Sequence, residues 1–534
     1  ITRQQTFVDP DRCILCGRCE EVCPIVTEIN GVKSAKAICS DGRTSIPGRP
    51  LIDKRRMPLC RENCPLGVNA QGYIALARAG KYAEALTLIR ECNILPGVCG
   101  RVCVHPCETD CRRGELDDAV SVRAIKRFLS DWGEKNPNEV NSPQAVPGRD
   151  EKFAVVGAGP AGLAAAAEIA RHGCGVTVFE KEKMAGGLLR YGIGTHRLPR
   201  RILDSELSYI EDLGVKFVFN QQMDSASDLD RLRNEFDGVI LATGSCKDRP
   251  LGVKGEDLDG VSGCLSFLGQ FHRGQAAEPG GKVAVIGDGN AAFDLARTLV
   301  RLGADVTIVS WFRKDEIPAD QEEIQGALEE GISIIDRSQV IEFQGENGRF
   351  ERLLCLPTEP GPEDSNGIAW PIIVNGGEPF ALEFYKAFVA IGQSGALESI
   401  GGVDISDSGF IVTDANFQTK LPKVFGAGDA VSGPSTVVHA MALGREAAVG
   451  ALRVCGIRME ENRPQRSVDR DFRDIPTNIP VRNRASMPEK QASDRRDSFS
   501  EVALGLSESQ IVYETERCLQ CGVCAECMQC EEIC

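Results

Sequence analysis

The sequence is poor in long apolar runs, in positive charge and in histidine. No apolar run reaches the roughly 18 residues that a membrane-spanning helix needs, so no transmembrane segment is expected. Basic residues number 61 against 77 acidic ones, a net charge of −16, so the chain has no broad cationic surface for a nucleic acid. The first residues also lack the basic-then-apolar pattern of a secretory signal. We therefore expect a cytoplasmic protein that binds no nucleic acid.

Cysteine, in contrast, is abundant and unevenly distributed. The chain has 23 cysteines: twelve between Cys13 and Cys111, six between Cys518 and Cys534, and five in the long stretch between. Such grouping indicates metal ligation rather than disulfides, which need an oxidising compartment and usually a small secreted domain. With 534 residues, the chain also exceeds what one hydrophobic core usually supports, so several domains are expected.

The first cysteine group has the spacing of a bacterial ferredoxin. Its members, in the pattern C-x-x-C-x-x-C-x-x-x-C before a proline, are Cys13, Cys16, Cys19 and Cys23. This pattern predicts a 4Fe-4S cluster, with a zinc site as the weaker alternative. In two-cluster ferredoxins the fourth cysteine of such a run binds the other cluster, so Cys23 need not share a cluster with the first three. Cys39 or Cys60 could then complete a site.

Two further cysteine groups follow. The second comprises Cys60, Cys64, Cys99, Cys103, Cys107 and Cys111, and apolar residues at helical spacing predict a helical pair between its halves. The third comprises Cys518, Cys521, Cys524, Cys527, Cys530 and Cys534, which exceed one cluster and fall short of two. At four thiolates per cluster, the 18 terminal cysteines predict three or four 4Fe-4S clusters.

A nucleotide-binding unit follows a polar linker near residues 133–150. The stretch "KFAVVGAGPAGLAAAAEIARHGCGVTVFE" predicts a strand, a Gly157-x-Gly159-x-x-Gly162 turn, a helix and a second strand that ends in Glu180. The glycines let a pyrophosphate approach the helix N-terminus, and the acidic residue can hold ribose hydroxyls.

A second unit repeats this pattern about 130 residues later, with Gly287-x-Gly289-x-x-Ala292 after a strand. Two dinucleotides are therefore expected. Because "VFGAGDA" comes after the second unit, the order predicts an FAD domain that a nicotinamide domain interrupts, with Asp429 near the ribityl or pyrophosphate of the flavin. The fold class is α/β, with two Rossmann-like domains.

The expected domains follow from these motifs. They are an N-terminal ferredoxin-like segment (1–54), a helical iron–sulfur domain (55–132), an FAD-binding domain (151–270 and 390–455), an NAD(P)-binding domain (280–389), a linker (456–510) and a C-terminal ferredoxin-like cluster segment (511–534). The lone cysteines between the groups are expected to be packed or exposed thiols: Cys174, Cys246, Cys264, Cys355 and Cys455. No C-x-x-C lies among them, so electrons must leave the flavin without a redox disulfide.

Across roughly residues 55–455, the sequence resembles the glutamate synthase small-subunit family. The markers include "CPLGVNAQGYI", "LPGVCGRVC", "GGLLRYGIGTHRLPR" and "GAGDAVSGPSTVVHAMALGREAA". The family includes the N-terminal half of dihydropyrimidine dehydrogenase and the large subunit of NADH-dependent ferredoxin:NADP oxidoreductase. The added ferredoxin-like ends look like those of multi-cluster relatives in heterodisulfide reductase, formate dehydrogenase or tungsten oxidoreductase complexes.

The resemblance, with the glycine turns, implies a set of cofactor contacts. The residues are Gly157, Gly159, Pro160, Ala161, Gly162, Glu180, Lys181, Gly187, Leu188, Arg197, Met223, Thr243, Gly244, Gly287, Asp288, Gly289, Asn290, Ala291, Gly392, Gly428, Asp429, Thr436 and Val437. It also implies one cluster that includes Cys64, Cys103 and Cys107, and another that includes Cys60 and Cys111, with Cys99 outside both.

This sequence departs from that family in its cluster ligands. Relatives carry a further C-x-x-C just before the equivalent of Cys60, where this chain reads "LIDKRRMPLC", and Lys126 stands where some relatives have a Gln or Glu ligand. One cluster drawn from the second cysteine group is therefore the simpler expectation.

The coenzyme site also departs from the family. Relatives that use NADPH carry Tyr-Arg-Arg after the second strand of the nucleotide domain, where this chain has Ser310, Trp311 and Phe312. Losing two guanidinium groups favours NADH over NADPH, although Arg313 and Lys314 follow directly and could bind the extra phosphate.

Together these patterns predict an FAD-dependent NAD(P)H oxidoreductase that feeds iron–sulfur acceptors. We expect a subunit that oxidises NADH, or reduces NAD, and exchanges single electrons with ferredoxin or a partner oxidoreductase subunit in a larger complex. The alternatives are a glutamate synthase small subunit, which would deliver NADPH electrons to a glutamine-using subunit, and a cluster-carrying scaffold without catalysis. Hydride transfer needs no acid or base, and His439, near the flavin, is the one histidine with a candidate role.

Overall fold

The computed structural model describes most of the chain. The described residues are 18–25, 27–29, 32–35, 38–40, 50–52, 57–143, 146–364, 369–395, 400–458, 475, 478–522 and 524–533. Three of the predicted cluster ligands, Cys13, Cys16 and Cys534, lie outside these residues.

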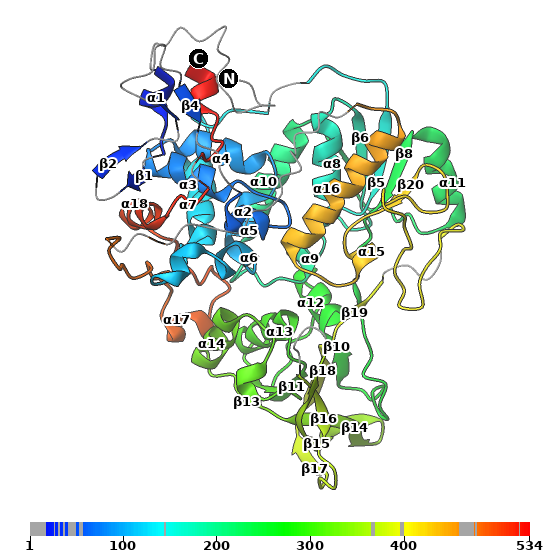
Figure 1. Cartoon of the computed structure of the whole chain (residues 1–534). Coiled ribbons are helices and arrows are strands. Elements are labelled where there is room, and N and C mark those ends of the chain that lie inside the picture. Colours follow the sequence, from blue (N-terminus) through cyan, green and yellow to red (C-terminus); the bar gives the residue numbers. More distant parts are fainter. Residues whose placement is uncertain are drawn as a thin grey trace.

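The first nucleotide-binding domain is built on a five-stranded parallel sheet in the order β20-β8-β5-β6-β7. Its strands are β5 (Lys152–Val156), β6 (Gly175–Phe179), β7 (Lys216–Val218), β8 (Gly238–Leu241) and β20 (Val424–Gly426). Its helices are α8 (Pro160–Arg171), α9 (Leu188–Tyr191), α10 (Arg200–Asp212), α11 (Ala226–Glu235), α15 (Asp429–Ser432) and α16 (Val437–Val454). β5 and β8 are almost wholly buried, as is usual in parallel sheets, and α8 packs along α16 (Figure 1).

The second nucleotide-binding domain is inserted into the first. Its parallel sheet has the order β10-β18-β11-β12-β13. The strands are β10 (Val261–Gly263), β11 (Lys282–Ile286), β12 (Asp305–Val309), β13 (Ser333–Ile335) and β18 (Lys386–Val389), and the helices are α12 (Cys264–His272), α13 (Asn290–Arg301), η2 (Lys314–Glu316) and α14 (Gln321–Glu329). An antiparallel layer extends from it: β14 (Ser338–Glu346), β15 (Arg349–Glu363), β16 (Ala369–Ile373) and β17 (Phe380–Glu383).

The two passages between these domains run side by side. On leaving the first domain the chain forms β9 (Lys247–Asp248), and on returning it forms β19 (Gln393–Ser394), which pairs with β9 in antiparallel register. Since β10 pairs with β18, the second sheet includes residues within the range 151–270 that the sequence assigned to the FAD domain. Strand pairing therefore places the start of the insertion before residue 261.

A helical domain precedes the first sheet and shares its core. Its helices are α2 (Leu59–Glu62), α3 (Ala70–Arg78), α4 (Tyr82–Arg90), α5 (Pro96–Val102), α6 (Pro106–Thr109), η1 (Arg112–Glu115) and α7 (Val122–Lys135). The predicted helical pair is confirmed as α3 and α4, and the Asn69 side chain caps α3 by accepting a hydrogen bond from Gly72 N at 3.1 Å. One buried apolar cluster runs from α3–α5 into α8 and α16, so the two domains form one packed unit.

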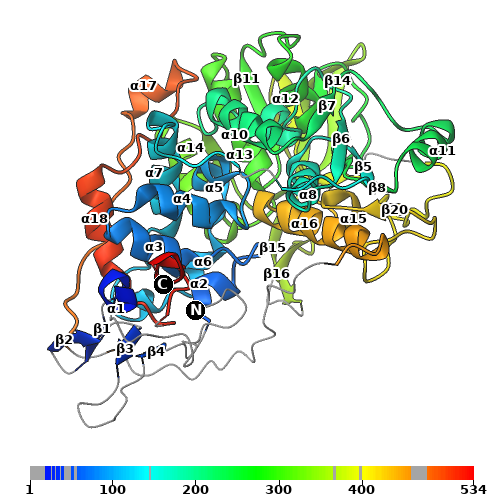
Figure 2. The same cartoon turned by 90° about the horizontal axis from the view of Figure 1, so that it is seen from above.

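The described parts of the N-terminal and C-terminal segments pack on this helical domain. The N-terminal elements are α1 (Arg18–Val22), β1 (Thr27–Ile29), β2 (Val32–Ala35), β3 (Ile38–Ser40) and β4 (Pro50–Ile52), and the C-terminal helices are α17 (Ala492–Arg496), α18 (Glu508–Arg517) and α19 (Gln529–Ile533). Helix α18 lies against α3 and α7, and α19 packs against α1 (Figure 2). Among the described helices, none combines the length and apolar character needed to cross a bilayer.

Candidate functional site: a dinucleotide cavity beside three cysteine groups

A cavity of about 310 Å³ opens at the carboxyl ends of β5, β6 and β8. In α/β sheets this is the edge where loops and helix N-termini present ligand contacts. Fourteen of the predicted cofactor residues line it: Gly157, Gly159, Pro160, Ala161, Glu180, Lys181, Gly187, Leu188, Met223, Thr243, Gly244, Asp429, Thr436 and Val437. The structure thus brings residues from the turn after β5, the end of β6 and the start of α16 to one site.

The turn after β5 is open because its glycines leave room. Gly157 has φ of +104°, and a Cβ there would collide with Ala242 O. A Cβ at Gly162 would collide with Gly157 O, so α8 can pack against the turn only with a glycine at this position. Gly162 therefore supports the cavity without lining it.

The polar groups of the cavity suit FAD. Glu180 is buried, and its carboxylate accepts hydrogen bonds from Ala158 N at 2.8 Å and Glu182 N at 2.9 Å, which orients it at the end of β6. Thr243 Oγ1 is buried with no partner in the protein. Burial raises the pKa of Asp429, whose carboxylate accepts a 2.6 Å hydrogen bond from Ser435 Oγ. A carboxylate oriented by backbone amides, a hydroxyl without a protein partner and the glycine turn fit the ribose and the pyrophosphate of FAD.

Three predicted residues lie elsewhere. Gly428 is not part of the cavity wall. Arg197 does not reach it either, because its guanidinium pairs with Asp294 at 2.6 Å and Glu323 at 2.7 Å in the second domain. His439 is in the first turn of α16, where its backbone N donates to Thr436 Oγ1 at 3.3 Å, and its side chain is not among the lining groups.

Several lining residues carry no sequence signal. Tyr191, Ser245, Cys246 and Arg273 come from irregular segments and helix ends. The Arg273 guanidinium lies 5.2 Å from the centre of the Tyr191 ring. Cys246 was expected to be an isolated thiol, and the structure places it in this cavity. Such contacts depend on loop paths that no periodic pattern encodes.

The second glycine turn lies between β11 and α13. Gly287 has φ of +141°, and a Cβ there would meet Ala390 O, whereas the space around Gly289 is open. Burial raises the pKa of Asp288 to about 6, and a hydrogen bond with Ser310 opposes this shift. Asn290 Oδ1 accepts from Asp320 N at 2.8 Å. The other predicted positions, Ala291 in α13 and Gly392 before β19, follow the carboxyl ends of β11 and β18.

Eleven of the described cysteines of the chain ends and the helical domain gather in three groups. The first contains Cys64, Cys103 and Cys107 around Lys126, which is 4% exposed. Burial by itself would lower the pKa of Lys126. The nearby thiolates raise this pKa by more than burial lowers it, and they belong to Cys103, Cys99, Cys107 and Cys64. A buried ammonium therefore balances this group.

The other two groups join segments that are distant in sequence. Cys60, Cys111, Cys518 and Cys521 line one small cavity. Cys23 of the segment after α1 lies near three tail thiols, Cys524, Cys527 and Cys530, and burial together with these neighbours raises the pKa of Cys530 to about 12. The single cluster expected from Cys60, Cys64, Cys103, Cys107 and Cys111 is therefore not what the structure assembles, because Cys60 and Cys111 gather with tail cysteines.

Among the described residues, no three His, Cys, Asp or Glu side chains are arranged to hold a single metal ion. A four-iron cluster holds its thiolates further apart than one ion does, since each thiolate binds its own iron.

Comparison with known proteins agrees with this geometry. The family model described as pyridine nucleotide-disulphide oxidoreductase matches residues 151–444. The chain belongs to this family. A second model, dihydropyrimidine dehydrogenase domain II with a 4Fe-4S cluster, matches residues 54–138, and a 4Fe-4S binding domain matches residues 6–26.

Three curated relatives match most of the chain. The chain is 35% identical over 517 residues to NADPH-Fe(3+) oxidoreductase subunit beta of Geobacter sulfurreducens, covering 88% of this chain and 76% of that protein. It is 36% identical to NADP(+)-dependent formate dehydrogenase subunit beta of Moorella thermoacetica, over 73% of this chain and 59% of that one. It is 32% identical to the glutamate synthase [NADPH] small chain of Escherichia coli, over 74% of this chain and 88% of that one. The predicted resemblance is confirmed.

Solved structures confirm the α/β fold class. FprA of Mycobacterium tuberculosis in complex with NADPH matches 58% of this chain and 85% of its own length, with a TM-score of 0.52 and 19% identity. The family models and the relatives together show an FAD-dependent NAD(P)H oxidoreductase with 4Fe-4S domains and an electron-transfer role.

Proposed function

We propose that this chain is the subunit of a larger complex that oxidises NADH through FAD and passes single electrons along 4Fe-4S clusters to ferredoxin or a partner oxidoreductase subunit. Bound FAD would accept a hydride and release its two electrons one at a time. The relatives named as subunits support a place in a complex.

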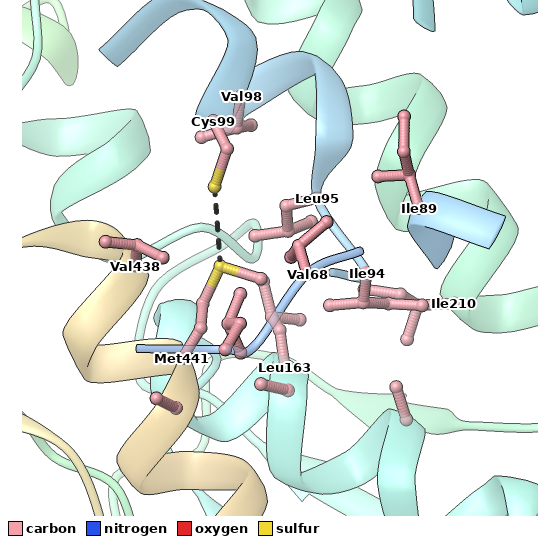
Figure 3. Packing of buried hydrophobic residues seen from close by; sticks show 14 of the residues in the cluster. Val68, Ile89, Ile94, Leu95, Val98, Cys99, Leu163, Ile210, Val438 and Met441 are labelled. Atoms are coloured by element: carbon pink, nitrogen blue, oxygen red, sulfur yellow. Dashed lines mark hydrogen bonds between the residues drawn. The ribbon is translucent and has the colours of Figure 1, made fainter. Parts of the chain in front are cut away.

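The main support for this proposal is that one hydrophobic core connects the flavin cavity with the group of Cys64, Cys103 and Cys107. Thr436 and Val437 at the start of α16 line the cavity, and Met441 follows one turn later in the same helix. Met441 Sδ lies 3.9 Å from Cys99 Sγ of α5, and the two side chains point toward each other (Figure 3). Cys103, at the end of α5, belongs to the first cysteine group. This packing supports electron transfer from the flavin into the helical domain.

The choice of NADH rests on the residues after β12. Phe312 is buried against the half-buried ring of Trp311, and Trp370 packs on both, so no cation stands at these positions. The exposed Arg313 is paired with Asp315 and Glu316, carboxylates that would compete with the extra phosphate of NADPH. The names of all three relatives described above carry NADPH or NADP(+), which argues the other way and makes the coenzyme the point to measure.

Steady-state kinetics with both coenzymes and a one-electron acceptor, such as ferredoxin, tests this proposal. Each lost charge-assisted contact is worth about 1.5 kcal/mol or more, so we expect kcat/KM for NADH to exceed that for NADPH by about tenfold. A preference for NADPH would overturn the coenzyme assignment. Absence of acceptor reduction with either coenzyme would overturn the whole proposal.

A glutamate synthase small subunit is the second candidate, favoured by the 88% coverage of that protein. The C-terminal cysteines count against it, because that match leaves about a quarter of this chain uncovered. Mixing the protein with a glutamine-using synthase subunit and NADPH distinguishes the two: glutamate formation would favour the second candidate.

A further inference from the structure

The tail cysteines are divided between two places in the structure. Cys524, Cys527 and Cys530 gather with Cys23, but Cys518 and Cys521 turn into the helical domain. There they share a cavity with Cys60 of α2 and Cys111, the residue before η1. Five apolar residues also line this cavity, namely Leu59, Ile74, Val120, Val122 and Leu519, together with four polar ones, namely Gln71, Arg112, Arg113 and Gln520. Four thiols from three separate segments thus meet in one cavity.

Buried ion pairs hold the tail in this position. Arg517, directly before Cys518, is fully buried and donates to Asp117 at 2.9 Å and Glu514 at 3.0 Å. Arg113, two residues after Cys111, pairs with the same Asp117 and donates to Arg517 O at 3.4 Å. The residues flanking Cys111 and Cys518 are therefore fastened to each other, and the cysteines meet because of this network.

A second set of contacts fixes the turn of the tail. Gly522 N donates to Gln71 Oε1 at 2.8 Å, and Asn69 Nδ2 donates to Ala525 O at 2.6 Å. Gln520, between the two tail cysteines, has φ of +48°. Left-handed residues in such turns align successive backbone N–H groups into anion-binding concavities, which are common at Fe–S sites.

The groups around the four thiols suit an anionic cluster. Gln520 is 5% exposed and lines the cavity, and its backbone N–H lies beside the Cys518 thiol. The cation of Arg112 and the backbone at Leu59 lie beside the Cys521 thiol. Amide donors and a cation thus surround the four thiols of this site.

We propose that Cys60, Cys111, Cys518 and Cys521 bind one 4Fe-4S cluster, so the C-terminal segment supplies half of its ligands. Four thiolates are the complete ligand set of a cubane. This assignment rests on the proposed role in electron transfer and adds a structural consequence: the tail is part of the helical iron–sulfur domain. It also leaves Cys524, Cys527 and Cys530 for a separate site with Cys23.

Metal analysis of paired variants tests the shared site. The Cys518→Ser/Cys521→Ser and Cys60→Ser/Cys111→Ser proteins are purified without oxygen, and iron and acid-labile sulfide are counted against the wild type. Each double variant is expected to lose about four irons and four sulfides, the content of one cubane. The quadruple variant is expected to lose the same four, because all four residues serve one cluster. A loss of about eight irons, or none from Cys518→Ser/Cys521→Ser, would overturn the proposal, as would zinc in place of iron.

Controls separate this result from misfolding and from failure of the proposed function. Cys455→Ser changes a half-buried thiol of the FAD domain, far in the chain from every group, and should keep all its iron. Bound FAD and NAD(P)H-dependent dye reduction should stay within about twofold of wild type in the double variants, since neither needs this cluster. If the double variants lose iron but the wild-type protein reduces no dye, the shared cluster site is supported and the proposed electron-transfer function is overturned.

The single variant Cys518→Ser replaces only one ligand and adds a spectroscopic readout if the double variants do not fold. An oxygen ligand in place of sulfur should alter the EPR signal of one reduced cluster and leave the rest unchanged. An unaltered spectrum would overturn the assignment of Cys518.

Discussion

The nucleotide-binding half and the iron–sulfur half are assembled in opposite ways. In the nucleotide half each site is centred on a contiguous strand–turn–helix unit, as with β5, Gly157–Gly162 and α8, and other loops complete the wall. In the iron–sulfur half, cysteines as far apart as Cys23 and Cys530, or Cys60 and Cys518, meet. A contiguous site depends on local backbone geometry, whereas a shared site depends on the docking of chain ends. The two halves should therefore fail in different ways.

The largest effect is expected from one methyl group in the first glycine turn. In Gly162→Ala the new Cβ would collide with Gly157 O, so the turn must open and FAD binding should fall to about a tenth or less. Flavin released by heat denaturation measures it, and iron content should stay near that of wild type. Gly175→Ala is the control, because its Cβ would meet Lys152 Cγ at an ordinary 3.5 Å. Equal loss of iron would show that the halves are not separable.

The second effect targets the docking of the tail. Arg517→Met removes the fully buried partner of Glu514 and Asp117, which should cost about 3–5 kcal/mol because two carboxylates stay buried without it. Thermal unfolding and iron content measure the result, and both should fall. Arg482→Met is the control, because Arg482 forms an exposed ion pair with Glu516, which lies on α18 like Arg517. Its loss should lower the free energy of unfolding by less than about 1 kcal/mol. Equal effects of the two variants would contradict a tail held by buried charge.

A smaller effect is expected from the buried ammonium of Lys126. Lys126→Gln removes a positive charge near Cys64, Cys103 and Cys107, so one cluster should become harder to reduce, by on the order of tens of millivolts. An EPR-monitored redox titration measures the shift. Lys135→Gln, at the exposed end of α7, is the control. If no midpoint potential moves, Lys126 does not face a cluster.

The smallest effect concerns pH and the second glycine turn. Burial raises the pKa of Asp288 to about 6, so this carboxyl is neutral below pH 6 and charged above it. The charged form repels a pyrophosphate, and KM for NADH should rise about threefold between pH 5 and pH 7. In Asp288→Asn, KM for NADH should no longer rise between pH 5 and pH 7. Asp305 is the first residue of β12, and Asp305→Asn is the control that should keep the rise in KM. A rise of equal size in Asp288→Asn would rule out this carboxyl.

The same contrast explains how much the sequence could predict. The α/β fold, both glycine turns and the α3–α4 pair followed from local patterns, because each depends on neighbours in the chain. Arg197 lies away from the cavity, because its ion-pair partner Asp294 comes from another segment. Cys246 is a free thiol as expected, but the sequence did not indicate its place in the cavity wall. The start of the insertion also differed, because β10 is recognisable only by its pairing with β18.

The cysteine groups show the same limit more sharply. Spacing predicts which cysteines are ligands but not how they group: nothing near Cys518 in the sequence indicates Cys60 or Cys111. The information lies in Arg113, Asp117 and Arg517, whose side chains pair only after the ends have docked. Under the proposed assignment, Cys518 and Cys521 would supply the C-x-x-C that this chain lacks before Cys60.

Rapid mixing of the anaerobic protein with NADH, followed by absorbance and freeze-quench EPR, most directly tests whether electrons enter the clusters through the flavin. We expect flavin absorbance to bleach first and reduced-cluster signals to grow afterwards. In FAD-depleted Gly162→Ala protein, cluster reduction should be slower by about a hundredfold or more, because no other group converts a hydride into single electrons. Cluster reduction at the same rate without FAD would contradict the proposed path.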